Sequence, residues 1–224
     1  RASVRAELEA KRGRLLFNGE WHKLFVVETA KDENRTLEGA PLDTLARQAG
    51  KDPLDYILDL ALSEKLDTTF VAQLLHNDDD AVGRILADPH THISLSDAGA
   101  HLTFFCDAGF GLHLMGHWSR DLGVLDLPQA VHRLTGQPAS LFGIEGRGLL
   151  REGYAADLML FDPATVARGP KRRAHDLPAG AARLTGSAVG LHGVWINGSR
   201  TADEKGFCAD PASRPGKVLR RFAA

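Results

Sequence analysis

The pattern of apolar residues changes near residue 143, and this change limits the folds open to the chain. Before it, short apolar runs that fit buried strands alternate with segments of helical spacing. After it, strand-like runs follow one another, and Asn197-Gly198 marks a hairpin turn between two of them. We therefore expect an α/β part over residues 1–143 and a mostly β part, with a C-terminal arm, over 144–224.

The first part carries clear start and stop signals for its elements. Pro41 and Gly50 bracket one predicted helix, and Asp52-Pro53 opens a second whose apolar residues recur at helical spacing. The further predicted helices cover residues 2–11, 78–86 and 128–141, and the predicted strands cover 24–27, 70–75 and 93–96. This alternation favours βα units and a parallel sheet.

Length and composition indicate an ordinary globular protein. At roughly 150 residues per domain, the 224 residues correspond to about one and a half domains. The shares of hydrophobic residues (43%) and charged residues (25%) argue against disorder. No apolar run approaches the roughly 20 residues that span a bilayer, so we expect no membrane partner. Two cysteines, Cys106 and Cys208, cannot form a disulfide framework, and the expected location is the cytoplasm.

Charge is distributed unevenly along the chain. Residues 1–167 carry 16 Lys and Arg against 25 Asp and Glu, whereas residues 168–224 carry 11 against 4. A basic segment, including Lys171-Arg172-Arg173 and Arg220-Arg221, can bind nucleic acid or lie against an acidic body of the same protein. Aromatic side chains that would stack on bases are sparse after residue 168, so we favour the second interpretation and expect no nucleic acid.

Five of the ten histidines lie between His90 and His117. His90-Thr91-His92 has the spacing of a metal-binding pair, but at about 3.3 Å per residue an extended chain would place His90 roughly 23 Å from Asp97. We expect a structural or surface role for His90 and His92. His113 and His117 would share one face of a helix, where a packed or substrate-facing pair is favoured over a metal-binding pair.

Asp97 is the strongest candidate for chemistry. It follows the apolar run 93–96 directly, and the small residues 98–100 after it leave room for a ligand. Functional groups gather at the carboxyl ends of parallel strands, although an Asp in this place can also cap a turn or a helix. His101 lies four residues further on and can face the same cavity. No nucleophile elbow, P-loop or dinucleotide fingerprint is present in a strand-to-helix context, which gives no support to a serine hydrolase or a nucleotide-binding protein.

Five motifs resemble, in the same order, the C-terminal part of the N-acyl-D-amino-acid deacylases, the D-aminoacylase-like branch of the amidohydrolase superfamily. The resemblance extends over nearly the whole chain from about Phe17, and "ENRTLEG" at 33–39 supports this branch. The motifs are "LSDAGAH" at 95–101, "AVHRLTGQPASLFGI" at 130–144, "GRGLLREGYAADLMLFDPATV" at 146–166, "GVWINGSR" at 193–200 and "SRPGKVLR" at 213–220.

The resemblance implies a metal-dependent TIM barrel joined to a small β-sandwich. It makes 93–96 the last barrel strand, Asp97 the catalytic carboxylate that also contacts the metal, and His101 a substrate-binding residue. The implied reaction is zinc-dependent hydrolysis of the amide bond of small N-acyl-D-amino acids. Such barrels run to about 250 residues, so we expect this chain to be a C-terminal fragment, inactive alone, with the principal Zn²⁺ ligands upstream of Arg1. The oligomeric state is not predicted.

Two other functions remain open at this point. The generic motifs are shared with amidohydrolases that act on cyclic amides, such as hydantoinases. The chain can also be a non-catalytic structural module. In addition, the segment 102–113, "LTFFCDAGFGLH", is apolar where many relatives have basic residues that pair with the substrate carboxylate, so this carboxylate must be bound from elsewhere or the substrate differs.

Overall fold

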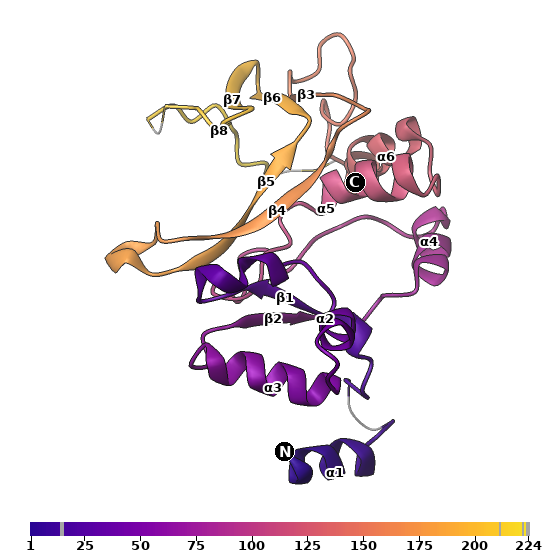
Figure 1. Cartoon of the computed structure of the whole chain (residues 1–224). Coiled ribbons are helices and arrows are strands. Elements are labelled where there is room, and N and C mark those ends of the chain that lie inside the picture. Colours follow the sequence, from indigo (N-terminus) through magenta and orange to yellow (C-terminus); the bar gives the residue numbers. More distant parts are fainter. Residues whose placement is uncertain (14–15, 211, 221, 223–224) are drawn as a thin grey trace. The chain divides into compact units, whose positions relative to one another are not determined.

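The computed structural model describes residues 1–13, 16–210, 212–220 and 222, so Arg221 of the second basic pair lies outside the described residues. The chain divides into two compact units, Arg1–Val82 and Gly83–Ala224, both drawn in Figure 1. The expected domain boundary at residue 143 stays a prediction.

The first unit is built on a two-stranded antiparallel sheet. β1 (Leu24–Glu28) pairs with β2 (Thr69–Ala72), and α2 (Leu42–Gln48) and α3 (Pro53–Ser63) lie between them in the sequence. The α/β character is confirmed, but the predicted parallel pairing is wrong for these strands. Two helices instead of one separate β1 from β2, so the chain reverses once more than in a βαβ unit. The core consists of Leu24, Val26, Leu42, Leu45 and Leu60.

Local signals explain where the helices of this unit begin. The Asp52 carboxylate accepts hydrogen bonds from the backbone N–H of Leu54 (2.9 Å) and Asp55 (3.4 Å), which confirms the predicted cap of α3. α1 (Ala2–Ala10) also forms as predicted, and Arg5 of α1 contacts the carboxylates of Asp52 (2.9 Å) and Asp55 (3.1 Å). Two 3₁₀ helices, η1 (Trp21–Lys23) and η2 (Asp32–Leu37), flank β1.

Glu64, just after α3, is the buried polar centre of the first unit, with 2% of its surface exposed. Its carboxylate accepts hydrogen bonds from the backbone N–H of Ala30 (3.1 Å) and Lys31 (3.2 Å), from Asn34 Nδ2 (2.8 Å) and from the Thr68 hydroxyl. Burial by itself raises the pKa of this carboxyl, but the four hydrogen bonds outweigh burial and lower the pKa to about 2. Glu64 therefore ties the loop after β1 to the end of α3.

Apart from one short 3₁₀ helix, the helices of the second unit precede its sheets in the sequence. They are α4 (Asp79–Ala87), which begins just before this unit, α5 (Phe110–His113), the π-helix η3 (Leu114–Asp121), α6 (Leu127–Leu134) and α7 (Gly136–Leu141). The prediction of one helix over 128–141 is wrong. Thr135 departs from helical backbone at φ −131° and ψ −81°, and Pro138 has no N–H to continue the ladder. A capping box between Asp126 and Gln129 begins α6.

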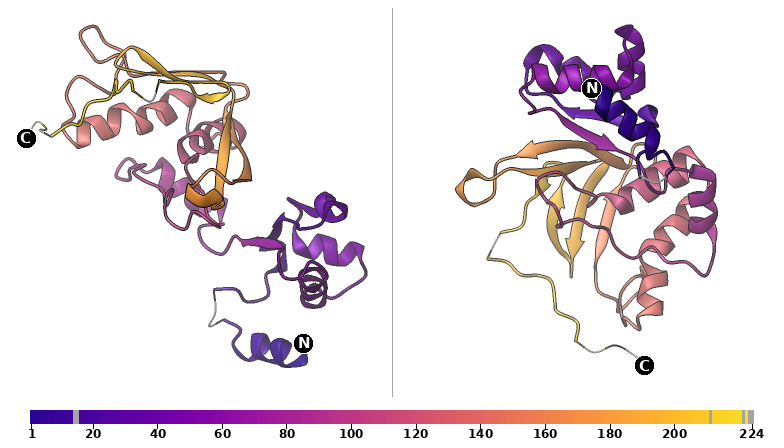
Figure 2. Two further views of the ribbon diagram at one scale, coloured as in Figure 1. Left: turned by 90° about the vertical axis from the view of Figure 1, so that its left-hand side faces the viewer. Right: turned by 90° about the horizontal axis from the view of Figure 1, so that it is seen from below.

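Two antiparallel sheets complete the second unit. One has the order β3 (Leu158–Phe161), β6 (Leu191–Ile196), β7 (Ser199–Asp203), β8 (Gly206–Phe207). The predicted hairpin between β6 and β7 is confirmed, with positive φ at Asn197 (47°) and Gly198 (82°). The other sheet is the ribbon of β4 (Ala167–Ala174) and β5 (Arg183–Val189), orange in Figures 1 and 2, with η4 (Pro178–Gly180) between its strands.

Five of the 11 cations of the basic segment lie in the β4–β5 ribbon. Lys171 and Arg168 approach the Asp107 carboxylate at 3.3 and 3.7 Å, and Arg183 donates two hydrogen bonds of 2.7 Å to Asp176. These contacts confirm that cations of the segment pair with acidic groups of the same chain. None of the described helices is long and apolar enough to cross a membrane.

The four hydrogen bonds to Glu64 predict an acid-dependent loss of stability. Because the folded pKa of about 2 lies below the ordinary value of 4.5, the ionised carboxylate contributes fully above pH 4.5, and this contribution disappears as the pH falls from 4.5 towards 2. Replacing Glu64 by Gln should lower the free energy of unfolding at pH 7 by about 2 kcal/mol, the cost expected for unsatisfied buried donors.

Urea unfolding between pH 2 and 7 measures this difference, which should shrink towards pH 2. The control is Glu33→Gln, because the Glu33 side chain is 74% exposed and only approaches Lys31 at 3.7 Å. Equal pH dependence of stability in the parent protein and in Glu64→Gln would show that the carboxylate has no such role.

Candidate functional site

The run that leads to Asp97 is not part of a sheet. Residues 92–96 belong to no strand, so the predicted strand over 93–96 is wrong for this structure. A strand exists only where a neighbour takes up its backbone N–H and C=O groups. Among the described strands, β1 and β2 pair only with each other, and no ladder extends to residues 93–96.

Arg133 of α6 fixes the chain just before this run. Its guanidinium, with the residue 7% exposed, donates hydrogen bonds to the backbone carbonyls of Asp88 (2.7 Å), Ala87 (3.0 Å) and Thr91 (3.1 Å). These bonds satisfy carbonyls at the end of α4, which have no partners within the helix. They also hold the segment that carries His90 and His92, both of which are exposed as the surface role predicts.

The turn at Asp97 forms without its carboxylate. The backbone carbonyl of Asp97 accepts a hydrogen bond from Ala100 N–H (3.0 Å), and the Ser96 hydroxyl accepts one from Ala98 N–H (3.2 Å). The Asp97 side chain is exposed, and its carboxylate makes no hydrogen bond or ion pair with any described residue. A capping Asp would use a side-chain oxygen for this purpose. The structure therefore gives no support to the alternative that Asp97 caps a turn or a helix.

His101 follows Asp97 in a conformation that is uncommon for a residue with a side chain. Its φ of 53° lies in the left-handed region, and its carbonyl accepts hydrogen bonds from the N–H of Phe104 and Phe105, both at 3.0 Å. The imidazole is exposed and stacks on the Phe104 ring, with 5.1 Å between centroids and 25° between planes. Asp97 and His101 thus begin two consecutive exposed turns, with no hydrogen bond between their side chains.

The β4–β5 ribbon holds the chain after His101. Leu184 N–H donates to the Leu102 carbonyl (2.7 Å), and Arg173 donates to the Thr103 carbonyl (3.1 Å). The Lys171 ammonium lies 5.5 Å from the centroid of the Phe105 ring, a cation–π contact. The basic strand therefore supports the loop that carries the candidate site.

The second histidine pair is packed, as expected. The rings of His113 and His117 stack at 4.7 Å with 6° between their planes, and the His117 ring meets the indole of buried Trp118 edge to face at 5.1 Å. Both imidazole rings are therefore packed against neighbouring aromatic rings.

A complete metal centre is not found within the described residues, which contain no group of three or more His, Cys, Asp or Glu side chains that could hold a metal ion. Structural and catalytic zinc sites use three or four protein ligands. The exposed, unpartnered carboxylate of Asp97 fits the role of one such ligand, and the described residues do not supply the others.

A groove of about 590 Å³ lies between α6 and β3 in the second unit, and its lining is mainly apolar. Val131, Leu149 and Met159 are among its lining residues, whereas Asp97 and His101 are not. The groove is therefore separate from the site that the sequence predicts.

Comparison with known proteins shows the family of the chain. Residues 21–202 match the model of an amidohydrolase family, Amidohydro_3. D-aminoacylase from Alcaligenes xylosoxydans xylosoxydans is 35% identical over 192 residues, which cover 84% of this chain and 35% of the relative. N-acyl-D-aspartate deacylase from the same organism is 41% identical over 100 residues, or 45% of this chain and 18% of the relative.

One solved structure agrees with this match. A crystal structure of D-aminoacylase, described as defining a novel subset of amidohydrolases, has a TM-score of 0.50 and is 30% identical in sequence. The alignment covers 93% of this chain and 39% of the solved chain. Another D-aminoacylase structure, described by its binuclear metal centre, has a TM-score of 0.48 and is 30% identical in sequence. The alignment covers 88% of this chain and 38% of the solved chain. The chain belongs to the amidohydrolase family, in its D-aminoacylase-like branch, and spans 35% of the length of the Alcaligenes D-aminoacylase.

Sequence reasoning missed two supports of the site, Arg133 and the β4–β5 ribbon. Arg133 lies three residues after buried Ala130 on the same helix face, and a charged residue within an apolar stripe was the available signal. For the ribbon, the available signal was the change from a net acidic to a net basic sequence at Arg168, near the start of the ribbon. The pairing of its strands depends on residues that are distant in the sequence.

The hydrogen bonds of Arg133 predict a local and a global effect of its removal. In Arg133→Gln, carbonyls of residues 87, 88 and 91 lose their buried donor, which should cost on the order of 3 kcal/mol in the free energy of unfolding. Hydrogen exchange of the Asp88 and Thr91 amides should accelerate more than exchange of the β6–β7 amides.

Arg84→Gln is the matched control, because Arg84 is exposed on the neighbouring helix α4. Unchanged exchange at Asp88 and Thr91 in the Arg133 variant would contradict the proposed support.

Proposed function

We propose that this chain is part of a metal-dependent amidohydrolase that cleaves the amide bond of N-acyl-D-amino acids, with Asp97 as its general base. Membership of the D-aminoacylase-like branch and the N-acyl-D-aspartate deacylase among the relatives support the reaction and the substrate class. The observation that carries the role of Asp97 is its exposed carboxylate, which has no partner among the described residues in a turn that other groups hold.

The proposed chemistry of Asp97 is proton transfer. A carboxylate oxygen accepts a proton from water as the water oxygen bonds to the acyl carbon, and the carboxyl group then returns this proton to the amine nitrogen as the C–N bond breaks. The products are a carboxylic acid and a free amino acid. A carboxylate without a structural partner is available for both steps.

The proposed cofactor is Zn²⁺, and Asp97 is its proposed ligand from this chain. When bound, zinc supplies Lewis acidity, which polarises the amide carbonyl and makes water a stronger acid at neutral pH. The remaining ligands would have to come from outside the described residues, among which no group of three ligands exists. For this reason we propose that the chain is inactive by itself.

His101 is proposed to orient the substrate. Its left-handed backbone places the imidazole on the Phe104 ring, in the turn that directly follows the Asp97 turn. Its exposed edge can donate a hydrogen bond to a substrate oxygen. The neighbouring cations Arg168 and Lys171 are already engaged with Asp107, so their charge is partly compensated.

The proposed setting is the C-terminal part of a TIM barrel over residues 1–143 and a small β-sandwich domain over 144–224. The antiparallel sheet β3-β6-β7-β8 and the ribbon β4–β5 support a mostly β second part. We also propose a cytoplasmic location, which the two free cysteines support.

A chimera tests this function. The segment of the Alcaligenes D-aminoacylase that precedes its matched region is fused to residues 1–224 of this chain, and the protein is loaded with zinc. We expect hydrolysis of N-acetyl-D-leucine or N-acetyl-D-aspartate, little hydrolysis of the L enantiomers or of a hydantoin, and none by the 224-residue chain. Asp97→Asn should lower kcat by about 10² to 10⁴ with an unchanged melting temperature.

Circular dichroism and zinc content verify that the chimera is folded and loaded, and Asp80→Asn, at an exposed position in α4, is the control for loss of a charge. A folded, zinc-loaded chimera that cleaves only the hydantoin supports the cyclic-amide reaction instead. A chimera that cleaves neither substrate supports a non-catalytic module, and full turnover by Asp97→Asn excludes the proposed role of Asp97.

A further inference from the structure

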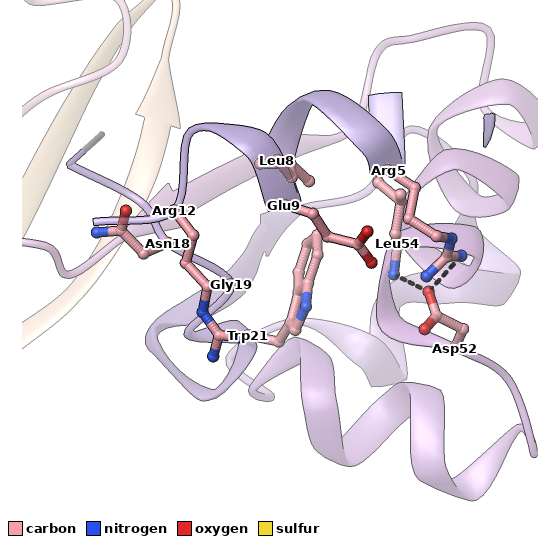
Figure 3. Close-up of a pocket in the computed structure, with 9 residues that line it drawn as sticks. All are labelled: Arg5, Leu8, Glu9, Arg12, Asn18, Gly19, Trp21, Asp52 and Leu54. Carbon is pink, nitrogen blue, oxygen red and sulfur yellow. Dashed lines mark hydrogen bonds and ion pairs between the residues drawn. The ribbon is translucent and has the colours of Figure 1, made fainter. Parts of the chain in front are cut away.

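A small hollow in the first unit has no role in the proposed reaction. Its volume is about 230 Å³, and it lies between α1, the segment before β1 and the start of α3, as Figure 3 shows. All of its lining residues belong to Arg1–Val82, and neither Asp97 nor His101 is among them. The hollow is smaller than the roughly 300 Å³ at which sites for drug-sized ligands begin, so it suits a very small molecule.

One part of the lining is apolar. Leu8 of α1, Leu54 of α3 and the indole of Trp21 contribute this surface. The indole is fixed because it packs edge to face with the Phe17 ring, with 4.9 Å between centroids and 72° between planes. A flat aromatic face next to two leucines favours a ligand with a branched or planar apolar group.

The other part of the lining is charged, and two of its charged side chains, Glu9 and Arg12, form no hydrogen bond or ion pair with a described residue, although Glu9 is close enough to Arg5 to feel its charge. The Arg5 guanidinium is paired with Asp52 and Asp55. Glu9 and Arg12 are three residues apart, a spacing at which opposite charges on a helix can pair. No hydrogen bond or ion pair joins either side chain to the other or to any other described residue. In the view of Figure 3, the indole of Trp21 lies between the Arg12 guanidinium and the Glu9 carboxylate.

We propose that this hollow binds a zwitterionic α-amino acid with an apolar side chain. Arg12 receives the α-carboxylate, Glu9 receives the α-ammonium group, and the side chain covers Trp21, Leu8 and Leu54. Arg5 forms its ion pairs with Asp52 and Asp55. The two charged groups that form no ion pair, Glu9 and Arg12, have opposite signs, and a ligand with a single charge can pair with only one of them. This inference does not depend on the proposed hydrolysis, because none of its residues takes part in that reaction.

Three related probes separate the two charges of the ligand. Leucine carries both, 3-methylbutylamine lacks the carboxylate, and 4-methylpentanoate lacks the amine. The intact chain is titrated with each probe while the indole N–H signals of its three tryptophans are followed by NMR. Trp21→Phe assigns the signal of Trp21. We expect leucine to shift this signal with a Kd of about 1 mM and each singly charged analogue to bind at least about tenfold more weakly.

Two variants and a control locate the binding. Arg12→Gln and Glu9→Gln change exposed side chains, so the fold should be kept, and each should weaken leucine binding at least about tenfold. Arg47→Gln, at an exposed arginine of α2 that pairs with Asp43, should leave binding unchanged. Absence of a leucine-dependent shift up to about 10 mM, equal affinity for all three probes, or normal binding by both hollow variants would each overturn the proposal.

Discussion

The candidate site depends on one buried cation. Arg133 projects from α6 and donates hydrogen bonds to three backbone carbonyls, two at the end of α4 and one at Thr91. Because the Arg133 guanidinium is nearly inaccessible to water, these bonds satisfy donors that would otherwise be buried without partners. They fix where the chain begins its path to Asp97. After Asp97, hydrogen bonds from Leu184 and Arg173 of the β4–β5 ribbon hold the chain again.

This arrangement separates the support of the turn from the group that can do chemistry. Ser96 and the backbone supply the hydrogen bonds that form the turn, so the Asp97 carboxylate contributes none of them. A polar side chain that makes no structural hydrogen bond, in a turn that other groups hold in place, is a candidate for function. Glu64 shows the contrast, because four hydrogen bonds occupy its buried carboxylate and keep its pKa at about 2.

Features with local causes could be predicted from the sequence. Asp52-Pro53 begins α3, and Asn197-Gly198 turns β6 into β7, because caps and two-residue turns depend on adjacent residues. Local signals could not decide whether residues 93–96 form a strand, since a strand needs a partner strand from a distant part of the sequence. The direction of β2 against β1 depends on how many reversals separate them, and the break at Thr135 depends on Pro138, whose missing N–H was visible in the sequence.

The proposed site was found partly by local pattern and partly by resemblance. An apolar run followed by Asp97 and small residues identified the carboxylate, but its freedom from structural hydrogen bonds could only be seen in three dimensions. Arg133 was hidden because sequence alone does not show which carbonyls lie near a helix face. The same holds for the Glu9 and Arg12 pair, since their spacing suggests an ion pair that the structure does not form.

The central claim is that the Asp97 carboxylate carries the proton during amide hydrolysis. Chemical rescue tests it most directly: turnover of the zinc-loaded Asp97→Ala chimera is measured as formate is added, beside the parent chimera. A small carboxylate that enters the vacated position should restore part of the lost turnover in proportion to its concentration and leave the parent unaffected. Parent-level turnover in Asp97→Ala without formate would contradict the claim.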